Sequence, residues 1–150
     1  MEHETPMKRP DWSEYFIEVA QVISKRSTCL RRRYGAVIVR DNVIVSTGYN
    51  GSPRGEVNCI DTGKCVRQEL HVPKGERYEL CSSVHAEQNA IINYDPSMMQ
   101  GATIYIAGFN ADGSVASGKP CLLCGRMIAN ARIAKIVYRD ESGNLIFNTL

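Results

Sequence analysis

The sequence predicts an α/β domain in which a mixed sheet carries helices on both faces. Two observations support this prediction: short apolar runs typical of strands alternate with segments of helical periodicity, and a strand hairpin precedes them. The hairpin requires antiparallel strands, whereas strand–helix–strand connections produce parallel ones, so the sheet should contain both. With 150 residues and 43% apolar content, the chain is expected to form one globular domain over residues 1–150.

The N-terminal segment divides into a leader and a helix. Residues 1–10 contain two prolines and mixed charges, which is typical of a loose leader. From Asp11 onward, apolar residues recur at helical spacing, so we expect an amphipathic helix that ends near Arg26. Asp11 or Ser13 could cap this helix, because either side chain can accept a hydrogen bond from the first turn.

A cluster of cations follows this helix. Five of the nine residues in 25–33 are lysine or arginine. Most such runs are simply charges exposed to solvent at a helix end and loop, but guanidinium groups also match the geometry of phosphate. We therefore expect some contact with a phosphate group from this stretch.

A hairpin and a glycine-rich loop come next. Residues 34–40 and 43–47 have the pattern of two strands joined by a tight turn. In the loop 48–55, Asn50 could simply form a turn with the glycine that follows it. Alternatively, Asn50 could direct its amide at a sugar hydroxyl. Position in the sequence does not decide between these two roles.

The C-terminal half alternates helices with strands. The expected elements are, in order, a helix over 85–94, a strand over 102–107, a loop over 108–119, a helix over 120–131, a strand over 135–138 and a short edge strand over 145–147. Pro120 would open the second of these helices, where proline is favoured because its missing N–H is not needed. Ligands should lie where the helices meet the strand ends.

Two short motifs carry the chemistry. The first begins at His85 and the second at Pro120, and together they match the H-x-E and P-C-x-x-C signature of zinc-dependent nucleobase deaminases. His85, Cys121 and Cys124 can supply three ligands of a tetrahedral zinc, which leaves the fourth position for water. Glu87 can lie beside that water as general acid and base. Both ligand sets fall at expected helix N-termini, whose partial positive charge should lower the thiol pKa.

A structural zinc site is the alternative interpretation of these motifs. Such a site would be closed by a fourth protein ligand and would have no use for a glutamate beside it. The presence of Glu87 therefore favours a catalytic zinc.

A polar insertion over residues 56–83 lies between the hairpin and the first motif. It shows no clear periodicity, and so long a connection usually carries a function or a brace. Its three cysteines and one earlier cysteine could form a second, closed zinc site made of Cys29, Cys59, Cys65 and Cys81. His71 could replace one of these ligands. The alternative is a set of reduced thiols packed in the core, but the insertion otherwise lacks a hydrophobic reason to fold.

Charge and apolar content exclude several functions. The net charge of +2 is smaller than that of most nucleic-acid-binding domains, so we expect no nucleic-acid partner. No apolar run is long enough to cross a bilayer, and the N-terminus lacks an apolar signal core. We therefore expect no membrane partner and a cytoplasmic location, where the six cysteines would be reduced.

Several stretches together resemble one family. They are TGYNGSP over 47–53, VHAEQNAI over 84–91, GATIY over 101–105 and PCLLC over 120–124. Over about residues 26–138 the chain is similar to the deoxycytidylate (dCMP) deaminases of the cytidine deaminase superfamily. The whole superfamily shares the two zinc motifs, and TGYNGSP narrows the resemblance to the dCMP branch. The resemblance implies a three-layer α/β/α sandwich that hydrolyses dCMP to dUMP and ammonia, which supplies dUMP for thymidylate synthesis.

The resemblance has further implications for regulation and for the catalytic residues. The family is commonly hexameric, is activated by dCTP with Mg²⁺ and is inhibited by dTTP at a second nucleotide site. By resemblance, His85, Cys121 and Cys124 bind the catalytic zinc, and Glu87 shuttles the protons.

Other residues are matched to the substrate. Asn50 matches the asparagine that contacts the sugar, and Arg26 and Ser27 fall in the segment that approaches the phosphate. The segment 108–119 is longer than the usual link in the family, so it could reshape the rim of the pocket.

A second zinc is found in some members of the family. Cys29 and Cys59 match two of its ligands, whereas Cys65 and Cys81 are our own inference, because the other two ligands vary among members.

Two other classes of function are consistent with the sequence. The chain could deaminate cytidine, a pyrimidine-pathway intermediate or an adenosine in transfer RNA. A nucleoside enzyme would not need the arginine cluster, and an RNA enzyme would need a broader basic face. The chain could also be a non-catalytic nucleotide sensor, but a sensor would have no chemical reason to keep Glu87.

Overall fold

A computed structural model describes residues 7–150 of the chain. The leader expected over residues 1–10 therefore lies largely outside the described residues, and its described part forms neither helix nor strand. Within the described residues, no helix has both the length and the apolar character needed to cross a membrane.

Helix α1 (Trp12–Ser24) is the first element, and it is amphipathic as predicted. Asp11 caps it, because a carboxylate oxygen of Asp11 accepts a hydrogen bond of 2.9 Å from the backbone N–H of Glu14. The helix ends two residues before Arg26, slightly earlier than expected.

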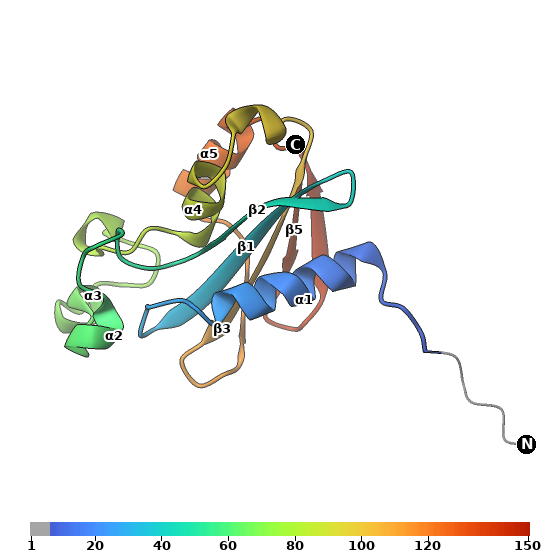
Figure 1. The fold of residues 1–150 in the computed structure, drawn as a ribbon. Helices are drawn as coiled ribbons and strands as arrows, with labels where there is room; N and C mark the ends of the chain where they lie inside the picture. The colour runs from blue at the N-terminus through green and yellow to red at the C-terminus, as the bar shows by residue number, and fades with distance from the viewer. Residues whose placement is uncertain (1–6) are drawn as a thin grey trace, which may run out of the picture.

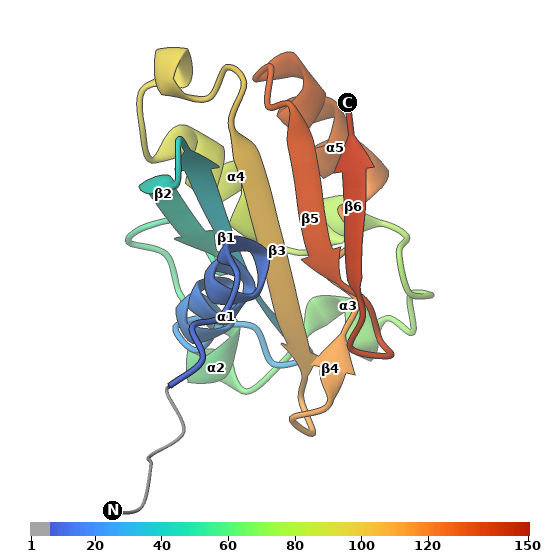
Figure 2. The ribbon, with the colours of Figure 1, turned by 90° about the vertical axis from the view of Figure 1, so that its right-hand side faces the viewer.

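In the described residues, six strands form one mixed sheet, as the sequence predicts. The order along the sheet is β2-β1-β3-β5-β6, and β4 pairs with the far end of β3 (Figure 2). β3 and β5 run parallel because a helix connects them, whereas the other neighbouring pairs are antiparallel. The strands are β1 (Arg32–Arg40), β2 (Val43–Tyr49), β3 (Thr103–Asn110), β4 (Val115–Ala116), β5 (Lys135–Arg139) and β6 (Leu145–Thr149).

Helices cover both faces of this sheet, which gives three layers (Figure 1). On one face, α1 buries Phe16 in a core that it shares with β1, β3 and β5. On the other face lie α4 (Ala86–Ile92) and α5 (Leu122–Asn130), which contribute Ala90 and Ile128 to a second core. Both motif helices therefore lie on the same side of the sheet.

Helix α4 lies very close to β2. A Cβ atom added to Gly48 would come within 2.4 Å of the backbone nitrogen of Ala90, so only glycine fits at this position. The hydroxyl of Ser46 donates a hydrogen bond of 2.6 Å to the carbonyl oxygen of Ala90. The amide of Asn93 donates another, of 3.0 Å, to the carbonyl oxygen of Thr47. These contacts fix the position of α4 on the sheet.

The expected loop over 108–119 is partly a hairpin, so that prediction is wrong. Strand β3 continues to Asn110, turns and pairs with β4. Gly113 adopts a φ of 87°, which favours glycine, and Asp112 accepts a hydrogen bond of 2.9 Å from the N–H of Ser114. An Asp-Gly pair of this kind is a recognised hairpin signal.

Helix α5 begins at Leu122 rather than at Pro120, so the expected start is also wrong. Cys121 is the N-cap residue, and its sulfur accepts a hydrogen bond of 3.5 Å from the backbone N–H of Cys124. The extended backbone of Cys121 prevents an earlier start.

The insertion over 56–83 forms a set of short turns at one end of the sheet (Figure 1). An isolated β-bridge between Gly51 and Val84 joins the chain segments on either side of the insertion. Its helices are α2 (Cys59–Thr62), α3 (Val66–Glu69) and the 3-10 helix η1 (Tyr78–Leu80), and a further 3-10 helix, η2 (Pro96–Met98), follows α4.

Candidate active site

His85 and Cys121 occupy equivalent positions in two helices. Each is an N-cap residue with extended backbone angles, His85 in α4 and Cys121 in α5. The backbone N–H of His85 donates a hydrogen bond of 2.9 Å to the side chain of Gln88, which closes the first turn of α4. Cys124 follows in the first turn of α5. The helices thus present all three side chains from the same face of the sheet.

These three residues, called here the three-ligand cluster (His85, Cys121 and Cys124), are spaced as a zinc site requires. Their ligand atoms all lie within 4.8 Å of one another. His85 Nδ1 is 3.2 Å from Cys124 Sγ and 3.6 Å from Cys121 Sγ. Zinc–sulfur bonds of about 2.3 Å and zinc–nitrogen bonds of about 2.0 Å at tetrahedral angles require a separation of about 3.5 Å. The cluster therefore fits a tetrahedral zinc with one position left for another ligand.

Glu87 lies next to this cluster on α4. Its residue surface is only 6% exposed. Burial raises the pKa of its carboxyl above the ordinary value, although a backbone N–H, His85 and Cys124 act in the opposite direction. A buried carboxyl group with a raised pKa can hold a proton and release it, as a general acid and base must.

At Cys124, burial outweighs the lowering of the thiol pKa that we expected from the helix end. This residue is fully buried, and burial raises the pKa of its thiol. Glu87 and Cys121 raise the pKa further. A metal ion bound at the cluster would favour the thiolate form.

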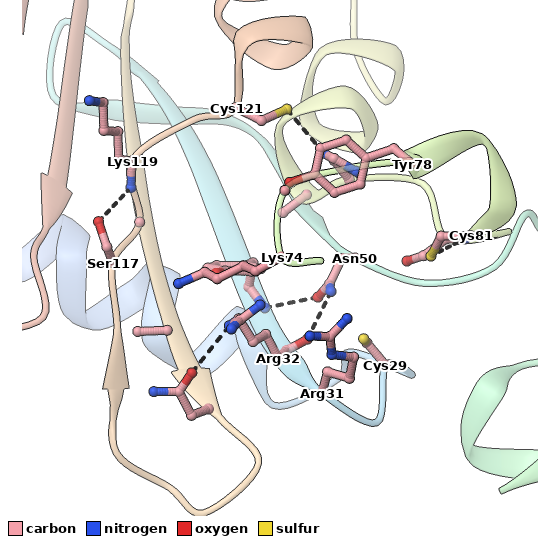
Figure 3. Close-up of a pocket in the computed structure, with 18 of the residues that line it drawn as sticks. Cys29, Arg31, Arg32, Asn50, Lys74, Tyr78, Cys81, Ser117, Lys119 and Cys121 are labelled. Atoms are coloured by element: carbon pink, nitrogen blue, oxygen red, sulfur yellow. Dashed lines mark hydrogen bonds between the residues drawn. The ribbon is translucent and has the colours of Figure 1, made fainter. Parts of the chain in front are cut away.

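A pocket of about 480 Å³ adjoins the cluster and Glu87 (Figure 3). Its walls come from β1, from the insertion and from the segment that leads into α5. More cations than acids line it: Arg31, Arg32, Arg67, Lys74 and Lys119, against Glu87 and Glu141. This balance of charge favours an anionic ligand.

The cationic stretch 25–33 reaches the pocket, but through Arg31 and Arg32 rather than through Arg26. Arg26 and Ser27 do not line it, and Ser27 is buried elsewhere. Arg31 and Arg32, where the chain enters β1, line it instead, and Arg31 Nη1 is buried without a hydrogen-bond partner among the described residues. Alternate residues of a strand share a face, so extending the strand pattern back from Tyr34 would have pointed to Arg32.

Asn50 lines the pocket, but half of the hydrogen-bonding capacity of its amide is already used by the start of β1 (Figure 3). Its Oδ1 accepts a hydrogen bond of 2.8 Å from the N–H of Tyr34, and its Nδ2 donates one of 2.9 Å to the carbonyl oxygen of Arg32. Only one N–H and one lone pair of the amide are left for a sugar hydroxyl. The first role of Asn50 is therefore to hold the wall of the pocket.

The four cysteines expected to bind a second zinc, called here the four-cysteine set, lie near one another. Burial raises the pKa of the Cys59 thiol, and Cys29, Cys81 and Cys65 raise it further. In the part of the chain that the structure describes, however, only the three-ligand cluster brings three ligand atoms within 4.8 Å. His71 is exposed and does not line the pocket.

The sequence matches a known family. Residues 10–140 match the model of the cytidine and deoxycytidylate deaminase zinc-binding region. The chain therefore belongs to the family of cytidine and deoxycytidylate deaminases, as its motifs predict.

Individual relatives carry the same assignment. The chain is 38% identical over 141 residues to the deoxycytidylate deaminase of Mycobacterium phage D29, which covers 91% of this chain and 100% of the relative. It is 37% identical over 133 residues to the deoxycytidylate deaminase of Schizosaccharomyces pombe, covering 89% of this chain and 38% of the relative. The chain thus spans the whole phage relative but well under half of the yeast one.

Solved structures agree on the fold. The dCMP deaminase of cyanophage S-TIM5 in its apo form matches with a TM-score of 0.61 and 28% identity, covering 89% of this chain and 86% of that one. The same enzyme in complex with dCMP and dUMP matches with a TM-score of 0.59 and 26% identity over 89% and 85%. A cytidine deaminase from Burkholderia pseudomallei, at 16% identity and a TM-score of 0.58 over 91% of each chain, shares the fold.

Proposed function

We propose that this chain is a zinc-dependent enzyme that hydrolyses dCMP to dUMP and ammonia, and so supplies dUMP for thymidylate synthesis. The observation that carries the proposal is the meeting of three zinc-type ligands and a buried glutamate in one cation-lined pocket. The deoxycytidylate deaminases among its relatives support this substrate.

The chemistry divides between a metal and Glu87. Zinc held by the three-ligand cluster would supply a Lewis acid that lowers the pKa of water from about 15.7 to about 7, or about 12 kcal/mol in favour of hydroxide at neutral pH. Glu87 would take a proton from the attacking water. It would deliver this proton to N3 of the cytosine, and would then carry the second proton, from the new hydroxyl on C4, to the departing amino group.

The 5′-phosphate of dCMP would bind the cationic wall of the pocket. Arg31 and Arg32 are the best placed. Among the described residues, Arg31 Nη1 lacks a hydrogen-bond partner, and the Arg32 side chain donates one hydrogen bond, of 3.3 Å from Nε to Oδ1 of Asn110. Neither arginine takes part in a salt bridge of the described residues. Substrate phosphate would therefore meet guanidinium groups that have no competing carboxylate.

A second zinc and the regulation of the family belong to the same proposal. The four-cysteine set would hold a structural zinc, which is supported by the family resemblance and by the place of Cys29, Cys65 and Cys81 in the lining of one pocket. Activation by dCTP with Mg²⁺, inhibition by dTTP and a hexameric assembly rest on the family resemblance. If neither nucleotide changes the rate at subsaturating dCMP, and if the chain sediments as a monomer, this part of the proposal is wrong.

Ultraviolet-monitored deamination by the zinc-loaded protein tests the function. The assay compares dCMP with deoxycytidine and CMP. Rapid loss of dCMP with little loss of deoxycytidine is the expected result. No turnover of any of the three, with zinc bound, would instead indicate an RNA or pathway-intermediate deaminase or a nucleotide sensor.

A pair of variants tests the assignment of the phosphate. Arg31→Gln should lower kcat/KM for dCMP by about 10- to 100-fold, the usual cost of losing a hydrogen bond to a charged group. Its rate with deoxycytidine should not change. Arg33→Gln is the matched control, because Arg33 is an exposed neighbour that does not line the pocket. Equal losses in both variants would contradict the assignment.

A further inference from the structure

The insertion carries a buried arginine whose charge has no carboxylate partner. Arg67 is only 8% exposed, yet the salt bridges of the described residues do not include it. Its Nε donates a hydrogen bond of 3.1 Å to the carbonyl oxygen of Glu76, and its Nη2 donates one of 3.4 Å to that of Pro73. Burying a charged group is unfavourable unless its polar atoms form hydrogen bonds. The carbonyl groups of the loop 73–76 supply these bonds, so the guanidinium group of Arg67 fixes the conformation of that loop.

Tyr78, just beyond that loop, stacks on the same guanidinium group. The central carbon of the Arg67 guanidinium lies 4.7 Å from the centroid of the Tyr78 ring, a cation–π contact. Both side chains line the pocket, where Figure 3 shows the ring of Tyr78. Arg67 therefore supports the aromatic ring that the insertion contributes to the pocket wall.

The other neighbour of this ring is His85, a member of the three-ligand cluster. The two rings meet edge to face, with centroids 5.1 Å apart and planes at 85°. A metal-binding histidine usually has its second ring nitrogen held by a hydrogen bond, which fixes the orientation of the ring. His85 directs Nδ1 at the cysteine sulfurs, and its Nε2 has no hydrogen-bond partner in the described part of the chain. The edge-to-face contact with Tyr78 can instead restrict the orientation of the His85 ring.

We propose that Arg67 and Tyr78 form a brace that orients His85 for metal binding, and that the insertion is thereby a working part of the catalytic site. The proposal rests on the proposed zinc at the three-ligand cluster. Both residues are positioning residues, because they act through His85. The phenol oxygen has no part in the brace, since it is the ring that touches both neighbours.

The rate at which the zinc-loaded chain of residues 1–150 releases zinc to a coloured chelator tests the brace. Tyr78→Ala and Arg67→Met remove its two members, and Tyr78→Phe keeps the ring. Arg77→Met is the matched control, because Arg77 belongs to the same insertion but is 60% exposed and pairs with Glu79. The His85→Ala variant should lack the zinc of the three-ligand cluster. The phase of zinc release that is absent from this variant is therefore assigned to that zinc.

Tyr78→Ala and Arg67→Met should release this zinc about 10- to 100-fold faster, as is usual when the group behind a metal ligand is lost. Their kcat for dCMP should fall in parallel. Tyr78→Phe should release zinc at the wild-type rate, and Arg77→Met should match the wild type in both measurements. Circular dichroism checks the fold, and if Arg67→Met does not fold, the two Tyr78 variants decide the question.

Release at the wild-type rate from a folded Tyr78→Ala variant would overturn the brace while leaving the proposed function intact. Equally fast release from Tyr78→Ala and Tyr78→Phe would also overturn it. A wild-type chain that binds no zinc at His85 would contradict the proposed function, and the brace with it. Faster release from Tyr78→Ala in a chain that binds zinc but does not deaminate dCMP would support the brace and refute the substrate.

Discussion

The two sets of candidate metal ligands beside the pocket differ in the structural elements that position them. His85 and Cys121 cap helices that pack on the sheet, and close contacts such as that between Gly48 and Ala90 fix one of these helices. The four-cysteine set is divided between the segment before β1 and an insertion whose α-helices have four residues each. Accordingly, the ligand atoms of the first set lie within 4.8 Å of one another, whereas no three of the second set do.

This difference indicates different roles for the metal. A site built on packed helices is organised before the metal arrives, which a catalytic centre requires. A site built on loops depends on its metal for order, so the binding energy of the metal is also folding energy. We expect variants of the first site to lose turnover and variants of the second to lose stability.

Glu87→Gln should have the largest effect on turnover. The variant keeps the three ligands but loses the group that moves protons, so kcat for dCMP should fall by about 10²- to 10⁴-fold. Metal content, measured by native mass spectrometry, should stay at the wild-type value. Near-normal turnover in the metal-replete variant would remove Glu87 from the mechanism.

Cys29→Ser should reverse this pattern. If the four-cysteine set binds zinc, the variant should lose about one zinc ion per chain and unfold at a lower temperature. Its loss of turnover should be smaller than that of Glu87→Gln. Unchanged metal content would refute the second zinc site. His71→Ala is the control, and a loss of zinc in that variant would show that His71 replaces a cysteine.

Gly48→Ala should test the preorganisation of the first site. The added Cβ would overlap the backbone of α4, so the free energy of unfolding should fall by about 3 kcal/mol. Gly125→Ala is the matched control, because a Cβ at Gly125 in α5 meets nothing within 4 Å. That variant should gain about 1 kcal/mol from helix propensity. Equal denaturant midpoints for the two variants would contradict the close packing of α4.

Tyr34→Phe should have the smallest effect, and only at high pH. Burial raises the pKa of Tyr34, in the wall of the pocket, from 10.0 to about 12. A pKa that is higher in the folded state stabilises the protein below pH 10, and this contribution of about 2 to 3 kcal/mol disappears as the pH rises to 12. The wild type should therefore lose more stability than Tyr34→Phe over this range. Parallel losses in urea unfolding at pH 9 and pH 12 would show that the hydroxyl is not buried.

Local patterns in the sequence predicted much of the fold and the three-ligand cluster. His85 and Cys121 cap two helices, and Cys124 lies in the first turn of the second one. The short sequence motifs therefore specify most of the local geometry of the site. The Asp11 cap and the main strands likewise follow from local periodicity. The β3–β4 hairpin was missed although Asp112 and Gly113 carried a local signal for it.

The features that could not be predicted depend on long-range contacts. The sequence indicated the cationic stretch 25–33, but the position of Arg32 in the pocket also depends on the pairing of β1 with β3, which sets Arg32 opposite Asn110. The amide of Asn50 is bonded to the backbone of β1 because Asn50 directly follows β2, which pairs with β1. The contact of Tyr78 with His85 depends on how the insertion folds back on the site.

A zinc titration of the metal-free chain, followed by its turnover of dCMP, tests the central claim most directly. The metal-free chain should be inactive, because its cluster and Glu87 cannot activate water alone. Turnover should rise in proportion to added zinc until the three-ligand cluster is filled, and Cys124→Ser should not recover at all. If the metal-free chain deaminates dCMP as fast as the zinc-loaded chain, the cluster is not the catalytic centre and the account is wrong.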